Sequence, residues 1–232
     1  MERFARRFAR VAAGILLAAC AGNAPEMAAF GPPDETSISF IVIGDTPYSV
    51  DDEAMLAQAL PMVKAGAYPF VIHVGDYKGG GAACSADHDD RFAALIEALA
   101  PIPVFYTPGD NEWTDCDRKN DPATGRTWSE LARLKAVRTR FFGEAPRVAK
   151  ASEYERQAAQ PENASWRHGG VRFATVHVVG TANGRIWALG DPLDAVAEAT
   201  DARDAANLAW ITHVLSLAKS QSAKALVIAM QA

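Results

Sequence analysis

Three apolar runs in the first half of the chain alternate with segments of helical pattern. The runs are SISFIVIGD (37–45), YPFVIHVGD (68–76) and IPVFYTPGD (102–110). Each is almost continuously apolar, which indicates a strand buried on both faces of a sheet. Residues 51–65 have helical composition, although Pro61 is expected to shorten or kink that helix, and residues 89–100 place apolar side chains on one helical face. This succession predicts an α/β domain with a parallel sheet.

The second half continues with helices and strands in a less regular order. We expect a helix over 127–142 that starts near Thr127 or Ser129, a loop-like stretch over 143–166, a strand over 171–180, a turn at TANGR, a helix over 201–219 and a strand over 225–232. The last run reaches the final residue without a polar tail, so we expect a fold that is incomplete at its C-terminus.

Each of the three apolar runs ends in Gly-Asp. The aspartates are Asp45, Asp76 and Asp110, spaced 31 and 34 residues apart, about one βαβ unit each. Because such units are right-handed, the carboxyl ends of the strands meet at one edge of the sheet. Three carboxylates at one edge repel one another, and a bound cation relieves that repulsion. Gly-Asp is also a common turn dipeptide, and Gly190-Asp191 is read as a plain turn.

The first 36 residues look separate from this domain. Residues 1–19 combine four arginines with the apolar run VAAGILLAA, the pattern of an export signal. The following Cys20 completes LAAC, which resembles the lipobox of bacterial lipoproteins and implies acylation of Cys20, a membrane anchor and a periplasmic location. An ordinary signal peptide with an incidental cysteine is the alternative. Residues 20–36 are expected to form a flexible tether, and residues 37–232 the domain.

Charge and cysteine content narrow the possible partners. The leader carries four arginines and Glu2, so residues 20–232 hold 19 basic and 27 acidic residues, a net charge of −8. This acidic balance argues against nucleic acid as a partner. Export would place Cys84 and Cys116 in an oxidising compartment, where a disulfide between them is expected and free thiols are the alternative.

The succession GD…GD…GDNE resembles the calcineurin-like metallophosphoesterases. The resemblance covers residues 38 to 232 and is most specific at GDNE. It implies an α/β fold in four layers (αββα), a β-sandwich flanked by helices, with divalent metal ions at the strand ends. It also implies hydrolysis of phosphoester bonds in a phosphorylated small molecule.

Residue by residue, the resemblance implies that Asp45, Asp76 and Asp110 bind metal, with Asp76 bridging two ions. Asn111 stands where the family has the histidine that protonates the leaving group. An asparagine donates a hydrogen bond to a phosphate oxygen but does not give up a proton near neutral pH. Asn111 is therefore assigned to catalysis and substrate binding, and Tyr48 is a second candidate for contacting the phosphate.

Other positions depart from the family or support the site. Pro47 and Gln231 occupy places of metal-binding histidines, and the family's GHxH motif does not occur. The resemblance implies Mn, Mg or Fe, and the loss of imidazoles favours oxygen-binding ions over Zn and leaves one bound ion possible. We expect Glu112 to orient Asn111, and His73 to support the site from behind.

The sequence thus predicts a metal-dependent phosphatase or phosphodiesterase of the bacterial envelope. The alternative is a catalytically degenerate lipoprotein that binds a ligand or partner, and a plain structural lipoprotein is a third possibility. The chain contains no G-x-S-x-G elbow, P-loop or G-x-G-x-x-G fingerprint, which argues against serine hydrolases and nucleotide-binding proteins.

Overall fold

The computed structural model of this chain describes residues 37–143 and 153–231. The predicted export signal (1–19), Cys20 and the tether (20–36) lie outside the described residues. The chain divides into residues 1–37 and residues 38–232, and the following description concerns the second unit. Within the described part, no helix has the length and apolarity needed to cross a membrane.

The first sheet is parallel, as predicted. Its strand order is β1 (Ile41–Ile43), β2 (Val71–His73) and β3 (Val104–Tyr106). Two helices connect these strands, α1 (Val50–Ala65) and α2 (Ala86–Ala98). Ser49 caps α1 by accepting a hydrogen bond from the Asp52 amide at 3.2 Å. Pro61 was expected to shorten or kink this helix, but α1 is not shortened and continues through Pro61 to Ala65, although Pro61 donates no backbone hydrogen bond.

The second sheet has the order β4 (Glu155–Arg156), β5 (Ala164–His168), β6 (Val171–Thr175) and β7 (Leu226–Ala229). β6 pairs in parallel with β7 and antiparallel with β5. β4 and the start of β5 lie in the segment 143–166 that was predicted to be loop-like, so that prediction is wrong. The alternation of buried and polar residues in this segment is too short to be recognised without its partner strand.

The remaining helices are η1 (Thr114–Arg118), α3 (Glu130–Phe141), α4 (Gly180–Gly184) and α5 (Leu193–Ser220). Ser129 caps α3, in agreement with the predicted start of that helix. α4 falls on the predicted turn and contains four residues with positive φ, Thr181, Ala182, Asn183 and Gly184. α5 begins eight residues before the predicted start at 201, and the extended Pro192 directly precedes its first residue.

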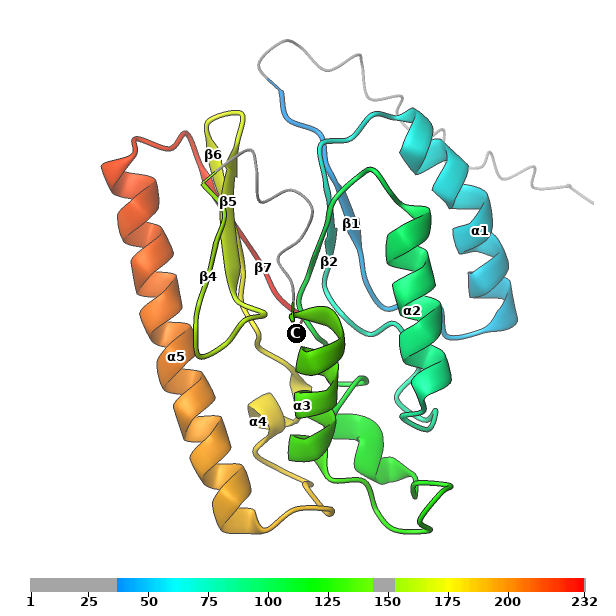
Figure 1. The fold of residues 1–232 in the computed structure, drawn as a ribbon. Coiled ribbons are helices and arrows are strands. Elements are labelled where there is room, and N and C mark those ends of the chain that lie inside the picture. Colours follow the sequence, from blue (N-terminus) through cyan, green and yellow to red (C-terminus); the bar gives the residue numbers. More distant parts are fainter. Residues whose placement is uncertain (1–36, 144–152, 232) are drawn as a thin grey trace, which may run out of the picture. The chain divides into compact units, whose positions relative to one another are not determined.

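The two sheets pack face to face through aromatic side chains. Phe105 stacks on Trp166 with ring centroids 3.6 Å apart, and Phe70 contacts both Trp166 and Phe173. On the outer face of the first sheet lie α1, α2 and α3, and α5 covers the second sheet through Trp210 and Val214 (Figure 1). The predicted four-layer αββα arrangement is therefore confirmed for the described residues.

A buried charged network connects α3 to the second sheet. The Glu162 carboxylate is fully buried and lies 2.6 Å from both the Arg138 guanidinium and His177 Nδ1. Burial by itself would raise the pKa of Glu162, but His177 and Arg138 lower it to about 2. Glu162 is therefore ionised over the whole physiological pH range, held by two partners.

Candidate functional site

Asp45, Asp76 and Asp110 lie two, three and four residues after the last residues of β1, β2 and β3. The carboxyl ends of these strands point downward in Figure 1. Asp45 and Asp76 have φ of 55° and 58°, in the left-handed region, so the chain turns sharply as it leaves each strand. A side chain at Gly75, where φ is 91°, would overlap the backbone of Gly109. The Gly-Asp sequence is thus needed because two strand ends approach each other closely.

A series of hydrogen bonds begins at Asp45. The Tyr48 hydroxyl donates to Asp45 Oδ1 at 3.1 Å, and Asn111 Nδ2 donates to the Tyr48 oxygen at 3.0 Å. The backbone amide of Asn111 donates to Asp76 Oδ1 at 3.1 Å. Tyr48 and Asn111, both assigned to the substrate from the sequence, therefore lie between the first and second aspartates.

The second sheet completes this series through Gln231, which follows β7. Its Nε2 donates to Asp76 Oδ2 at 3.2 Å and to Asp110 Oδ1 at 3.4 Å, while its Oε1 accepts from the Gly180 amide at 3.3 Å. All three strand-end aspartates thus belong to one connected cluster. We call Asp45, Tyr48, Asp76, Asp110, Asn111 and Gln231 the strand-end cluster.

The strand-end cluster brings acidic side chains close together. Burial raises the pKa of Asp76 to about 8, and repulsion from Glu112, Asp110 and Asp45 adds to this increase. Burial and the nearby carboxylates also raise the pKa of Tyr48, so its hydroxyl stays protonated and can donate. A carboxyl group that resists ionisation among other carboxylates indicates a place where a cation would be stabilised.

The donor atoms suit a hard divalent cation, since they are carboxylate, hydroxyl and amide oxygens. In the parts of the chain that are described, no three or more His, Cys, Asp or Glu side chains are already arranged to hold a metal ion. The Gln231 amide nitrogen lies between Asp76 and Asp110. A half-turn of that amide would exchange its nitrogen for its oxygen, which is a metal ligand.

Glu112 and His73 act on the backbone of the site. The fully buried Glu112 accepts hydrogen bonds from the amides of Tyr77 at 3.1 Å and Gly109 at 3.0 Å. It therefore joins the loops after β2 and β3, whereas the sequence suggested that it orients Asn111. His73 Nδ1 accepts from the Gly75 amide at 3.2 Å, and burial lowers the pKa of His73 to about 3, so the ring is neutral.

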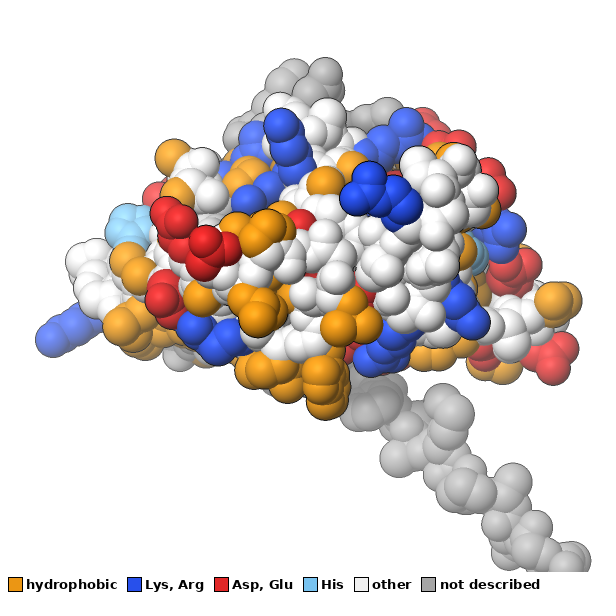
Figure 2. Space-filling view, turned by 90° about the horizontal axis from the view of Figure 1, so that it is seen from below, with side chains coloured by type: hydrophobic (Ala, Val, Ile, Leu, Met, Phe, Trp, Pro, Cys, Tyr) orange, Lys and Arg blue, Asp and Glu red, His pale blue; other side chains and the backbone are white. Residues whose placement is uncertain are grey.

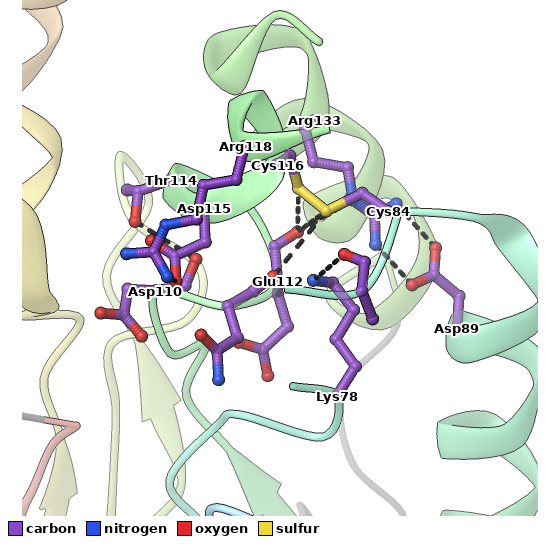
Figure 3. Close-up of a disulfide and its surroundings, with 12 residues drawn as sticks. Lys78, Cys84, Asp89, Asp110, Glu112, Thr114, Asp115, Cys116, Arg118 and Arg133 are labelled. Atoms are coloured by element: carbon purple, nitrogen blue, oxygen red, sulfur yellow. Dashed lines mark hydrogen bonds and ion pairs between the residues drawn. A yellow bond between two sulfur atoms is a disulfide. The ribbon is translucent and has the colours of Figure 1, made fainter. Parts of the chain in front are cut away.

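The predicted disulfide is present. Cys84 and Cys116 are bonded, with their Cα atoms 5.5 Å apart. Cys84 belongs to the loop after β2 and Cys116 to η1, after β3, so the bond joins the two loops that Glu112 also joins (Figure 3).

Sequence reasoning missed Lys78, a buried lysine beside the acidic side chains of the site. Lys78 is 1% exposed, and its Nζ donates to the carbonyls of Ala82 at 3.0 Å and Gly79 at 3.4 Å. Burial lowers its pKa, while Glu112 and nearby aspartates oppose that change. Lys78 lies near Glu112 (Figure 3), and its positive charge offsets part of the negative charge of Glu112, Asp115 and Asp76. The sequence pointed to a role for Lys78 in the site only through its position, two residues after Asp76.

The face that carries the site is seen from below in Figure 2. Acidic side chains gather mainly toward the margins, and only small acidic areas reach the surface near the middle. This agrees with the burial of Asp76 and Glu112, which are 3% and 0% exposed.

Comparison with known proteins identifies the family. The family model of calcineurin-like phosphoesterases matches residues 38–206, well over half of the chain. No match was found among curated proteins or among solved structures. The matched segment contains all three strand-end Gly-Asp pairs, the third within GDNE, and strands β1 to β6, whereas β7 and Gln231 follow it in the chain. Proteins of this kind generally use divalent metals. The chain therefore belongs to the calcineurin-like phosphoesterase family.

Proposed function

We propose that this protein hydrolyses phosphoester bonds with the help of a bound divalent metal ion, as a phosphatase or phosphodiesterase. The observation that carries the proposal is the strand-end cluster, in which hydrogen bonds connect Asp45, Asp76 and Asp110 through Tyr48, Asn111 and Gln231. Family membership supports the general chemistry.

In this proposal Asp45, Asp76 and Asp110 hold the metal, with Mn, Mg or Fe as candidates. A bound divalent ion supplies charge stabilisation for the phosphoryl group and lowers the pKa of a water molecule. Asn111 and Tyr48 orient the phosphate through hydrogen bonds. Neither residue is an effective proton donor near neutral pH, so esters with good leaving groups are expected to react fastest.

The alternative function is a binding module without turnover. The specific observation that favours it is Gln231, whose amide hydrogen bonds occupy both Asp76 and Asp110 in the place of a family metal ligand. Pro47 and Asn111 remove two further imidazoles. A protein of this kind would bind a phosphorylated ligand at the same edge of the sheet.

The deciding experiment measures Mn²⁺ and Mg²⁺ binding by calorimetry together with hydrolysis of aryl phosphomonoesters and phosphodiesters. Asp76→Asn preserves the shape of the side chain and is expected to weaken metal binding and abolish turnover. Asp90→Asn is the matched control, because Asp90 is an exposed aspartate on α2 that pairs with Arg140. Metal binding without turnover in the unmodified protein would refute the hydrolase and support the binding module.

We also propose that the protein is exported and anchored in the periplasm by a lipid on Cys20. The support is the LAAC sequence after an arginine-rich apolar leader. Metabolic labelling with palmitate tests the proposal. Label is expected on the unmodified chain and not on Cys20→Ser, and an unlabelled soluble protein would contradict it.

A further inference from the structure

A cavity of about 850 Å³ lies between α1 and α2. Its α1 wall is formed by Leu56, Ala57 and Leu60, and its α2 wall includes Phe92 and Leu95. We call it the α1–α2 groove. Its volume is in the range of small-molecule binding sites. No residue of α1 is fully buried, so the apolar side chains on its inner face remain partly uncovered.

The α1–α2 groove reaches the strand-end cluster. Tyr48 lines the groove, and its hydroxyl contacts both Asp45 and Asn111. Tyr77, the neighbour of Asp76 in the chain, also lines the groove, as does Gly79. A molecule that placed a phosphate at the cluster would therefore have the mouth of the groove beside it.

The chemistry of the walls selects an uncharged, apolar occupant. The charged side chains in the lining are Glu53 and Arg91, which form an ion pair with each other at 3.0 Å across the groove. Their charges cancel, so neither is left to bind a charged ligand. The lining also includes His88, and burial lowers the pKa of its ring, which favours the neutral form. The lining is otherwise mainly apolar, and each methylene group buried there gains hydrophobic free energy.

We propose that the α1–α2 groove receives the hydrocarbon part of the substrate, so that the protein acts on phosphoesters that carry an alkyl or aryl group rather than on small polar phosphates. This inference rests on the proposed phosphoesterase function. The concave form of the site, with helices on two sides and Tyr48 at the end nearest the strand-end cluster, fits an apolar group attached to a phosphate.

The test uses alkylphosphonates from methyl to octyl, which are not hydrolysed, with the full-length protein. Dissociation constants are measured by calorimetry with and without Mn²⁺. The dissociation constant is expected to fall about fourfold for each methylene that enters the groove. A parallel assay follows hydrolysis of p-nitrophenyl alkyl phosphates and alkyl monophosphates with Mn²⁺.

Two substitutions fill the groove from opposite walls, Ala57→Trp on α1 and Ala94→Trp on α2. Both positions are exposed and line the groove, so a larger side chain is expected to leave folding intact, which circular dichroism checks. Each is expected to abolish the dependence on alkyl length. Ala54→Trp is the matched control, an exposed position on α1 outside the groove, and is expected to keep that dependence.

The outcomes separate the two proposals. Affinity that does not change with alkyl length in the unmodified protein overturns the groove assignment, even if the esters are hydrolysed. Equal length dependence in the Ala57→Trp, Ala94→Trp and Ala54→Trp proteins overturns it as well. Length-dependent phosphonate binding that Ala57→Trp and Ala94→Trp remove, without hydrolysis of any ester, supports the groove and refutes the hydrolase.

Discussion

Replacing Glu112 with alanine is expected to destabilise the protein strongly. Glu112 is fully buried and accepts hydrogen bonds from the backbone amides of Tyr77 and Gly109. In Glu112→Ala both amides lose their acceptor. Water can replace the carboxylate only if it enters the cavity that the shortened side chain leaves. Glu112→Ala therefore affects the two loops that carry Asp76 and Asp110 at the same time.

The expected loss of unfolding free energy in Glu112→Ala can be estimated from the two amides that lose their acceptor. An orphaned buried donor costs about 1–3 kcal/mol, so two cost roughly 2–6 kcal/mol. Burial of the carboxyl, which raises the pKa of Glu112 to about 7, disfavours its charged form and offsets part of this cost. We expect a net loss of about 2–4 kcal/mol in the free energy of unfolding, or about 4–16 °C in Tm for a domain of this size.

Urea unfolding followed by tryptophan fluorescence measures this loss. Glu112→Gln is the matched control, since its amide oxygen still accepts one of the two hydrogen bonds, and its loss should be smaller. If Glu112→Ala lies within about 0.5 kcal/mol of the unmodified protein, the range of an ordinary surface substitution, the two hydrogen bonds do not hold the loops together.

Three further predictions concern the same domain. Cys84→Ser is expected to cost about 3–4 kcal/mol of unfolding free energy, because the disulfide closes a loop of 32 residues. It should also speed hydrogen exchange in both loops that the disulfide joins, and equal stability of the oxidised and reduced proteins would contradict this prediction. Gly109→Ala is expected to weaken Mn²⁺ binding, because the added methyl group meets Asp76 Oδ1, whereas Gly81→Ala, which meets nothing within 4 Å, should bind as the unmodified protein does. The folded-state pKa of Glu162 is below its unfolded value, so its contribution to stability is complete above about pH 4.5 and is lost as pH falls toward 2; unfolding curves over this range should show the loss, and Glu162→Gln should flatten it.

The strand-end aspartates could be predicted because their signal is local and repeated. Each Gly-Asp stands at the end of an apolar run, and parallel strands bring such ends together whatever else the fold contains. The disulfide was expected because Cys84 and Cys116 remain once Cys20 is assigned to the proposed anchor, and because export, itself only proposed, would place them in an oxidising compartment. Cys84 and Cys116 lie in the loops that follow Asp76 and Asp110, and these loops leave the same edge of the sheet.

The support behind these aspartates could not be predicted, since it depends on contacts between distant segments. Gln231 reaches Asp76 from the other sheet, 155 residues away along the chain. Glu112 lies next to Asn111 in sequence, yet its carboxylate turns to backbone amides of two other residues. The alternation of apolar and polar residues in β4 and β5 is too short to distinguish these strands from a loop. β5 is a strand because it pairs with β6.

The shallow attachment of α1 has a consequence for motion. Local opening requires the least free energy where few side chains are buried, and α1 has no fully buried residue. Native-state hydrogen exchange should therefore find α1 opening before β2, β3 and α2. Since the segment that enters α1 carries Asp45 and Tyr48, such an excursion would detach one corner of the site and leave Asp76 and Asp110, stapled by the disulfide, in place. Metal bound at that corner would then slow the exchange of α1, a helix that carries none of the proposed metal ligands.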